Sequence, residues 1–235
     1  MNDQTPGGDA LQTRWSRIHT LHDQDAGDSW KWFIDRYSEA IRGMLRRHLP
    51  ARFADEAEKE FWGYLFQSRA LVRANPGLRF RAFLAGIVLN YARAWLRSQR
   101  RGVEFERLSD LPQSAVVVPA QAPDELWLWS RQTLVLALET MTAKFATQAV
   151  VLQWFYGLPT RDGDSSALSV AEIARRLGKS HAAIQQDLSR GRVRLRQCIE
   201  AELREQVGSE VDLQDEMRVV FGVIDRQQPG LLPDR

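Results

Sequence analysis

The sequence predicts an all-α protein, with two small helical domains joined by a flexible linker and a helix-turn-helix in the C-terminal half. Apolar residues recur at helical spacing in one segment after another, whereas no useful length alternates apolar and polar residues as a half-buried strand does. A proline-containing stretch without periodicity, residues 102–123, separates two helical regions. A chain of 235 residues is long enough for two small domains with cores of their own.

The first predicted domain covers residues 13–101. Before it, the polar residues 1–12 contain glycine and proline and are expected to be disordered. A short helical segment is expected to open at Thr13–Ser16, and longer helices are predicted over Trp30–His48 and Asp55–Ser68. Pro50 closes the first of these two, and acidic residues begin the second.

The segment Arg79–Arg101 is basic, aromatic and without any acid. Its dense apolar residues are typical of a core helix with a basic far end. A second interpretation is that its aromatic side chains stack on unpaired bases while the arginines hold phosphates. Periodicity alone does not choose between the two.

After the linker, residues 124–206 form the second predicted domain. Two helices are expected, Asp124–Met141 and Ala143–Tyr156, followed by a polar loop over residues 157–168. A C-terminal extension, residues 207–235, follows this domain. Within it, apolar residues at helical spacing from Leu213 to Ile224 predict an amphipathic helix that packs on the protein's own body rather than on a separate partner.

The sequence from Ser169 to Arg196 carries the strongest local signals. Ser169 and Glu172 form a capping box, and Gly178 suits the positive φ at which a helix ends. Ser180 is a good N-cap for a second helix, whose apolar stripe includes Ile184 and Leu188. Two helices joined by a tight turn are therefore expected here, the second reaching about residue 206.

The polar side of this second helix has the composition of a DNA-reading surface. Amides and hydroxyls can read base edges, and guanidinium groups can hold phosphates. The candidate DNA-binding residues are Lys179, His181, Gln185, Gln186, Ser189, Arg190 and Arg196. The alternative is an amphipathic helical hairpin whose basic face is merely solvated. Asp187, the one acid among these basic residues, is expected to face phosphates, so that Asp187→Arg tightens duplex binding.

Composition excludes several other classes. The single cysteine, Cys198, allows no intramolecular disulfide and favours a reducing, cytoplasmic location. The N-terminus does not resemble a signal peptide, and no apolar run approaches the length of a membrane span, so no membrane partner is expected. His19, His22 and Asp23 could bind a metal, but such residues are more often simply exposed. No phosphate loop, HExxH or cysteine ligand set is present, and we expect no enzyme, small-molecule substrate, metal or cofactor.

The order of these segments resembles a bacterial RNA polymerase sigma factor of the extracytoplasmic-function (ECF) type, in the sigma-70 superfamily. The resemblance covers about Thr13 to Glu205. Its most specific parts are FRAFLAGIVLNYARAWLRSQRR, residues 80–101, and LSVAEIARRLGKS, residues 168–180. The first is similar to the family's helix that melts and reads the minus-ten element, and the second to its minus-thirty-five helix-turn-helix. FADEAEKEFW, residues 53–62, lies where the family has its polymerase-docking helix.

The resemblance implies a transcription initiation factor whose partners are core RNA polymerase, promoter DNA and an anti-sigma factor. It implies that Asn90 captures a flipped base, as an amide can, and that Arg93, Arg97, Arg100 and Arg101 hold the extruded strand. It places polymerase docking on Asp55, Glu56, Lys59 and Glu60. Two alternatives remain open: a stand-alone helix-turn-helix regulator, and a sigma-like interaction protein that has lost promoter reading.

Overall fold

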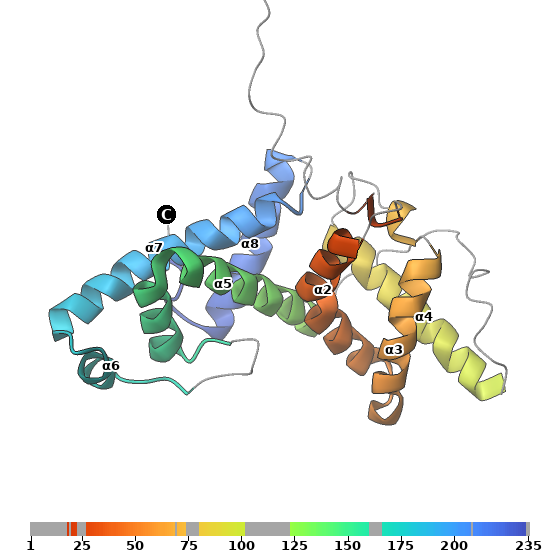
Figure 1. Ribbon diagram of the computed structural model, residues 1–235, viewed down its shortest axis with the longest axis horizontal. Helices are drawn as coiled ribbons and strands as arrows, with labels where there is room; N and C mark the ends of the chain where they lie inside the picture. Colours follow the sequence, from red (N-terminus) through yellow and green to blue (C-terminus); the bar gives the residue numbers. More distant parts are fainter. Residues whose placement is uncertain are drawn as a thin grey trace, which may run out of the picture. The chain divides into compact units, whose positions relative to one another are not determined.

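The structure is a computed structural model that describes residues 18, 20–22, 27–68, 70–73, 80–101, 123–159, 166–207 and 209–233 (Figure 1). These residues form seven α-helices and two short 3-10 helices, and none of them lies in a strand. The predicted all-α fold class is therefore confirmed. The expected disorder of residues 1–12, the helical opening at Thr13–Ser16 and the linker, residues 102–122, lie outside the described residues.

The chain divides into two compact units. Unit 1 comprises Met1–Trp129 and Glu205–Ser209, and unit 2 comprises Ser130–Arg204 and Glu210–Arg235. The division falls inside the helix α5 (Pro123–Tyr156), whereas the sequence places the start of the second domain at residue 124. Within unit 1, the Trp129 ring stacks on Tyr37 of α2 (Gly27–His48), with centroids 5.7 Å apart. This packing explains why the first turns of α5 belong with the N-terminal helices.

Unit 1 is built around α2, α3 (Ala51–Ser68) and α4 (Phe80–Arg101). The 3-10 helices Thr20–His22 and Ala70–Arg73 contact each other. Pro50 separates α2 from α3, as the sequence predicts, and α3 begins four positions earlier than expected. The core consists of side chains that are almost fully buried, among them Phe33, Tyr37, Ile41, Leu45, Phe61, Leu65, Leu84, Tyr91 and Trp95.

Helix α5 is one run with a break rather than the two predicted helices. Phe145 has φ −143° and ψ 52°, which lies outside the helical region. The break comes close to the predicted junction between Met141 and Ala143. Among the described residues, α5 is also the one helix that is long and apolar enough to cross a membrane by length and composition, contrary to the sequence-based expectation. That is weak evidence, because the core helix of a soluble protein meets the same criteria.

Unit 2 combines most of α5 with α6 (Val170–Leu177), α7 (His181–Arg204) and α8 (Glu210–Gln227). Helix α8 lies beside α7 (Figure 1). The buried side chains of α8 include Leu213, Met217, Val220 and Ile224. These four belong to the predicted apolar stripe, so the expectation that the C-terminal extension packs on the protein's own body is confirmed.

Candidate nucleic-acid interface

The turn between α6 and α7 has the local geometry that its sequence predicts. The Ser169 hydroxyl accepts a hydrogen bond from the Glu172 backbone N–H at 3.2 Å, and the Glu172 carboxylate accepts one from the Ser169 N–H at 3.0 Å. The bonds from Ser169 lower the pKa of Glu172. Gly178 ends α6 with φ 62°, and the Ser180 hydroxyl caps α7 by accepting from the Ala183 N–H at 3.2 Å. These hydrogen bonds satisfy backbone N–H groups at the start of each helix, and with Gly178 they define the turn between α6 and α7.

The inner side of α7 meets α5 closely at Gly191. A Cβ at this position would lie 3.1 Å from Leu152 and 3.4 Å from the Cβ of Gln148, so only glycine allows this approach without displacing a neighbour. Ile184, Leu188 and Leu195 are fully buried on the same side. The predicted apolar stripe is confirmed.

Asp187 lies on this inner side, and the expectation that it faces DNA is wrong. It is 8% exposed. Its carboxylate accepts hydrogen bonds from Lys179 Nζ at 2.6 Å and from Gln148 Nε2 at 3.1 Å. Burial alone raises the pKa of Asp187, but the bonds from Lys179 and Gln148 outweigh it, and the pKa lies below its ordinary value. On a helical wheel Asp187 lies at the edge of the apolar stripe of α7, and it is buried because α5 packs against that edge.

The outer side of α7 is open. Five of the seven candidate residues here are exposed and make no side-chain hydrogen bond or salt bridge in the part of the chain that the structure describes: His181, Gln185, Gln186, Ser189 and Arg190. Lys179 is also exposed, but the Asp187 carboxylate neutralises part of its charge. The geometry therefore presents amides, a hydroxyl and a guanidinium on one helical face.

Arg196 is held by the C-terminal extension. It donates to the carbonyl oxygen of Pro233 at 2.7 Å, and its guanidinium lies 4.5 Å from the Phe221 ring centroid. It is half-buried, so its placement with the freely exposed candidates needs correction. Sequence reasoning could not find these partners, because they come from a segment beyond the family resemblance.

Two further arginines of α7 are fixed in a similar way. Arg192 Nε donates to Tyr156 Oη at 2.8 Å, and Arg194 lies over the Phe145 ring, 3.9 Å from its centroid. Rings and neutral oxygens position these guanidinium groups without cancelling their charge. Arg192 and Arg194 therefore have defined positions on α7, and none of these partners is an acidic group.

On α4 the structure decides between the two interpretations of the basic aromatic segment. Tyr91 and Trp95 are fully buried, and Phe80 and Phe83 are nearly so. Tyr91 Oη donates to the Ala57 carbonyl oxygen at 2.9 Å, and burial raises the pKa of this phenol. Side chains inside the core cannot stack on bases, so the stacking interpretation of α4 is wrong for all its described aromatic residues.

The basic candidates Arg93 and Arg97 lie on the side of α4 away from its buried aromatic residues, whereas Asn90 borders them. Asn90 is half-buried, whereas Arg93 and Arg97 are exposed and follow it at helical spacing. The side chains of Arg100 and Arg101 lie outside the description, although the backbone of both continues α4. On α4, Arg93 and Arg97 are therefore accessible to a partner, whereas the described aromatic side chains are part of the core.

The four predicted docking residues on α3 have different environments. Glu56 and Lys59 are exposed, and the exposed Asp55 pairs with Arg46 of α2 at 3.2 Å. Glu60 is half-buried and accepts a hydrogen bond from the Trp95 indole at 2.9 Å. Glu58, which the sequence did not single out, accepts two bonds from Arg42 Nε, at 2.8 and 3.1 Å. Some acidic residues of α3, such as Glu58 and Glu60, therefore bond to other helices of unit 1, whereas Glu56 is exposed on its surface.

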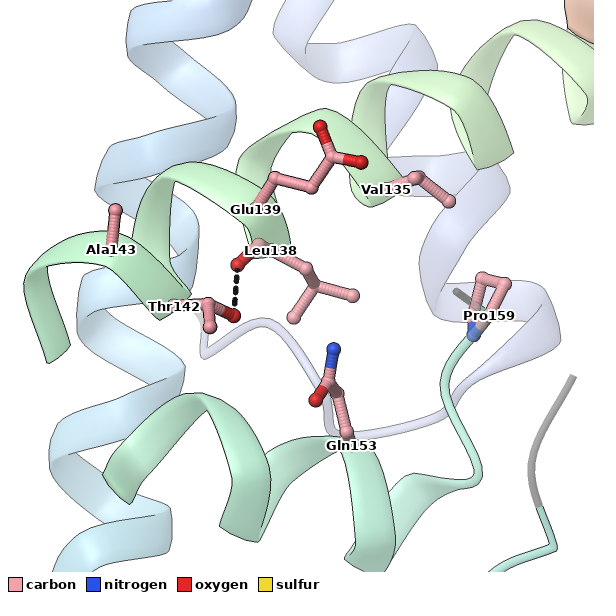
Figure 2. Close-up of a pocket in the computed structure, with 7 residues that line it drawn as sticks. All are labelled: Val135, Leu138, Glu139, Thr142, Ala143, Gln153 and Pro159. Atoms are coloured by element: carbon pink, nitrogen blue, oxygen red, sulfur yellow. Dashed lines mark hydrogen bonds between the residues drawn. The ribbon is translucent and has the colours of Figure 1, made fainter. Parts of the chain in front are cut away.

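A hollow of about 400 Å³ opens in the bend of α5 (Figure 2). All its lining residues except Pro159 come from α5, on both sides of Phe145. Leu138 and Val135 supply apolar walls, and Thr142 is tied back to the Leu138 carbonyl oxygen at 2.7 Å. The described residues contain no group of three or more His, Cys, Asp or Glu that could hold a metal, while His19 and the side chain of His22 are not described.

No protein-family model, curated protein or solved structure matches this chain.

Proposed function

We propose that this protein is a transcription initiation factor that binds core RNA polymerase and directs it to promoters. The observation that carries the proposal is the exposed face of α7, with Gln185, Gln186, Ser189 and Arg190 directly after a capped helix and a glycine turn. In this proposal α6 and α7 form a helix-turn-helix, and α7 lies in the major groove. The amides and the hydroxyl then read base edges, and Arg190 contacts phosphate or guanine.

Charge supports the same proposal. Arg190 and Arg175 are exposed, and Arg192, Arg194 and Arg196 stay cationic beside rings and neutral oxygens. Duplex binding gains free energy from counterion release at each neutralised phosphate. The chain's net charge of +2 conceals this local concentration of cations.

The polymerase and minus-ten parts of the proposal rest on the sequence resemblance. On α4, exposed Arg93 and Arg97 and the neighbouring Asn90 remain suited to holding a melted strand without help from aromatic stacking. On α3, exposed Asp55, Glu56 and Lys59 remain suited to a polar docking contact, whereas Glu60 also has a structural role. An anti-sigma factor is a further proposed partner.

Transcription in vitro tests the proposal. Core polymerase with and without the full chain is given a library of genomic promoters, and transcripts are sequenced. We expect transcripts from a defined subset of promoters only when the protein is present. If the library yields the same transcripts in both reactions, the protein is not an initiation factor.

The burial of the α4 aromatics favours a second candidate, a stand-alone duplex-binding regulator. Loss of the stacking role leaves α7 as the better supported DNA contact, and α7 alone needs no polymerase. This candidate predicts sequence-specific retention of duplex DNA by the isolated protein together with no stimulation of core polymerase.

A further inference from the structure

Gln148 occupies a central position where α5 and α7 cross. Its side-chain nitrogen donates to Asp187 Oδ1 at 3.1 Å, and its side-chain oxygen accepts from Arg194 Nη1 at 2.5 Å. Asp187 and Arg194 lie two turns apart on α7, and Gly191, where the two helices approach closely, lies between them. The side-chain amide of Gln148 therefore bonds to α7 on both sides of Gly191.

The same network reaches the two places where the backbone changes direction. Through Asp187 it holds Lys179, which belongs to the turn between α6 and α7. Through Arg194 it reaches Phe145, the residue with non-helical angles in α5, at 3.9 Å from the ring centroid. Each residue of the network contacts the next in the series Phe145, Arg194, Gln148, Asp187 and Lys179.

We propose that Gln148 is a positioning residue that sets the orientation of the exposed α7 face relative to α6. The inference rests on the proposed DNA-reading function, since the face it positions carries Gln185, Gln186, Ser189 and Arg190. Gln148 itself contacts no DNA. An amide suits the place because it donates to a carboxylate and accepts from a guanidinium at once, which neither a carboxylate nor an apolar side chain can do.

The orientation of α7 matters because the hydrogen bonds that read base edges form only at the right distance and angle. A bidentate contact to a base edge depends on both hydrogen bonds being near ideal length and angle. A small rotation of α7 loses such contacts, whereas phosphate contacts by flexible cations tolerate it. Loosening the network therefore lowers sequence discrimination more than overall duplex affinity.

Gln148→Glu tests this role. At neutral pH the new carboxylate pairs well with Arg194 but repels Asp187. The full chain selects from short duplexes with a randomised central segment, and enrichment of the preferred sequence is counted. We expect enrichment to fall by roughly tenfold, the value of about one base contact. Gln153→Glu is the matched control: it adds the same charge on the same arm of α5, away from the network, and leaves enrichment unchanged.

Rescue separates positioning from a general loss of stability. In Gln148→Glu/Asp187→Asn the polarity of the pair is exchanged: the new amide at 187 donates to the new carboxylate at 148. Net charge equals that of the wild type, so a difference in enrichment between the two proteins does not come from a change in overall charge. We expect enrichment to recover in the double variant. Failure to recover, or unchanged enrichment in Gln148→Glu alone, overturns the proposal.

Hydrogen exchange distinguishes failure of this inference from failure of the proposed function. If the wild type enriches no sequence, DNA reading is wrong, but the network is still judged by amide exchange in the turn between α6 and α7. Faster exchange in Gln148→Glu and restored protection in the double variant support the positioning role. Equal exchange in all three proteins overturns it.

Discussion

The Trp95 indole N–H donates to the Glu60 carboxylate at 2.9 Å, and this bond joins α4 to α3. The resemblance assigns the two helices to different tasks, one to DNA and one to polymerase. Their most aromatic and most acidic segments nevertheless meet inside unit 1. Trp95 is fully buried and contacts Phe53 edge-on at 5.2 Å, so its main role is structural.

Trp95→Phe is expected to destabilise unit 1 by about 1–3 kcal/mol. Phenylalanine keeps most of the apolar contact but leaves the half-buried Glu60 without its donor. Urea unfolding measures the loss. Arg97→Ala, an exposed change half a turn further along α4, is the control and is expected to change stability by less than about 0.5 kcal/mol. Unchanged stability together with lost binding to single-stranded DNA would restore a stacking role to Trp95.

Asp187 is expected to make unit 2 sensitive to acid. Its folded-state pKa lies below its ordinary value of about 3.9, so its contribution to stability is fully present above that value. The contribution is lost as the pH falls through the lower, folded-state pKa. Unfolding free energies of the wild type and Asp187→Asn should therefore differ most at neutral pH and converge in acid. A constant difference across this range contradicts the assignment.

Arg190 and Arg196 form a matched pair on one helix, since each substitution by alanine removes one positive charge from α7. Arg190 is exposed, so Arg190→Ala should make the slope of log K against log salt less steep by about 0.9, the effect of one lost phosphate contact. Arg196 is held by Phe221 and Pro233, so Arg196→Ala should mainly lower the melting temperature. Duplex titrations at several salt concentrations, with melting curves, separate the two effects. The reverse result would mean that the C-terminal extension releases Arg196 on DNA.

Helix α8 of the C-terminal extension is expected to be part of the fold of unit 2. Met217 on α8 is 3% exposed, so Met217→Ala should cost about 2–5 kcal/mol through the cavity that it leaves. Val211 on the same helix is 75% exposed, and Val211→Ala is the control with little expected effect. Denaturant unfolding compares the two. Equal stability of both variants would show that α8 does not depend on its contact with α7.

Local chemistry made several features readable from the sequence. The capping box at Ser169 and the positive φ at Gly178 depend on residues within one turn of chain, so short patterns predict them. The apolar stripes of α2, α7 and α8 follow from helical periodicity in the same way. The sequence predicts a break in α5 close to its true place, but it does not identify Phe145 as the non-helical residue, because no proline or glycine marks the position.

Only the tertiary structure decided which polar side chains are available to a partner. Asp187, Arg196 and Glu60 appear on helical wheels as polar or flanking residues, and each is engaged by a segment 35 or more residues away in the chain: Gln148 for Asp187, Pro233 for Arg196 and Trp95 for Glu60. The aromatic face of α4 is core for the same reason, since α2 and α3 pack against it. A pattern along the chain reports which side of a helix is apolar, but burial and pairing depend on what folds against that side, which no local pattern encodes.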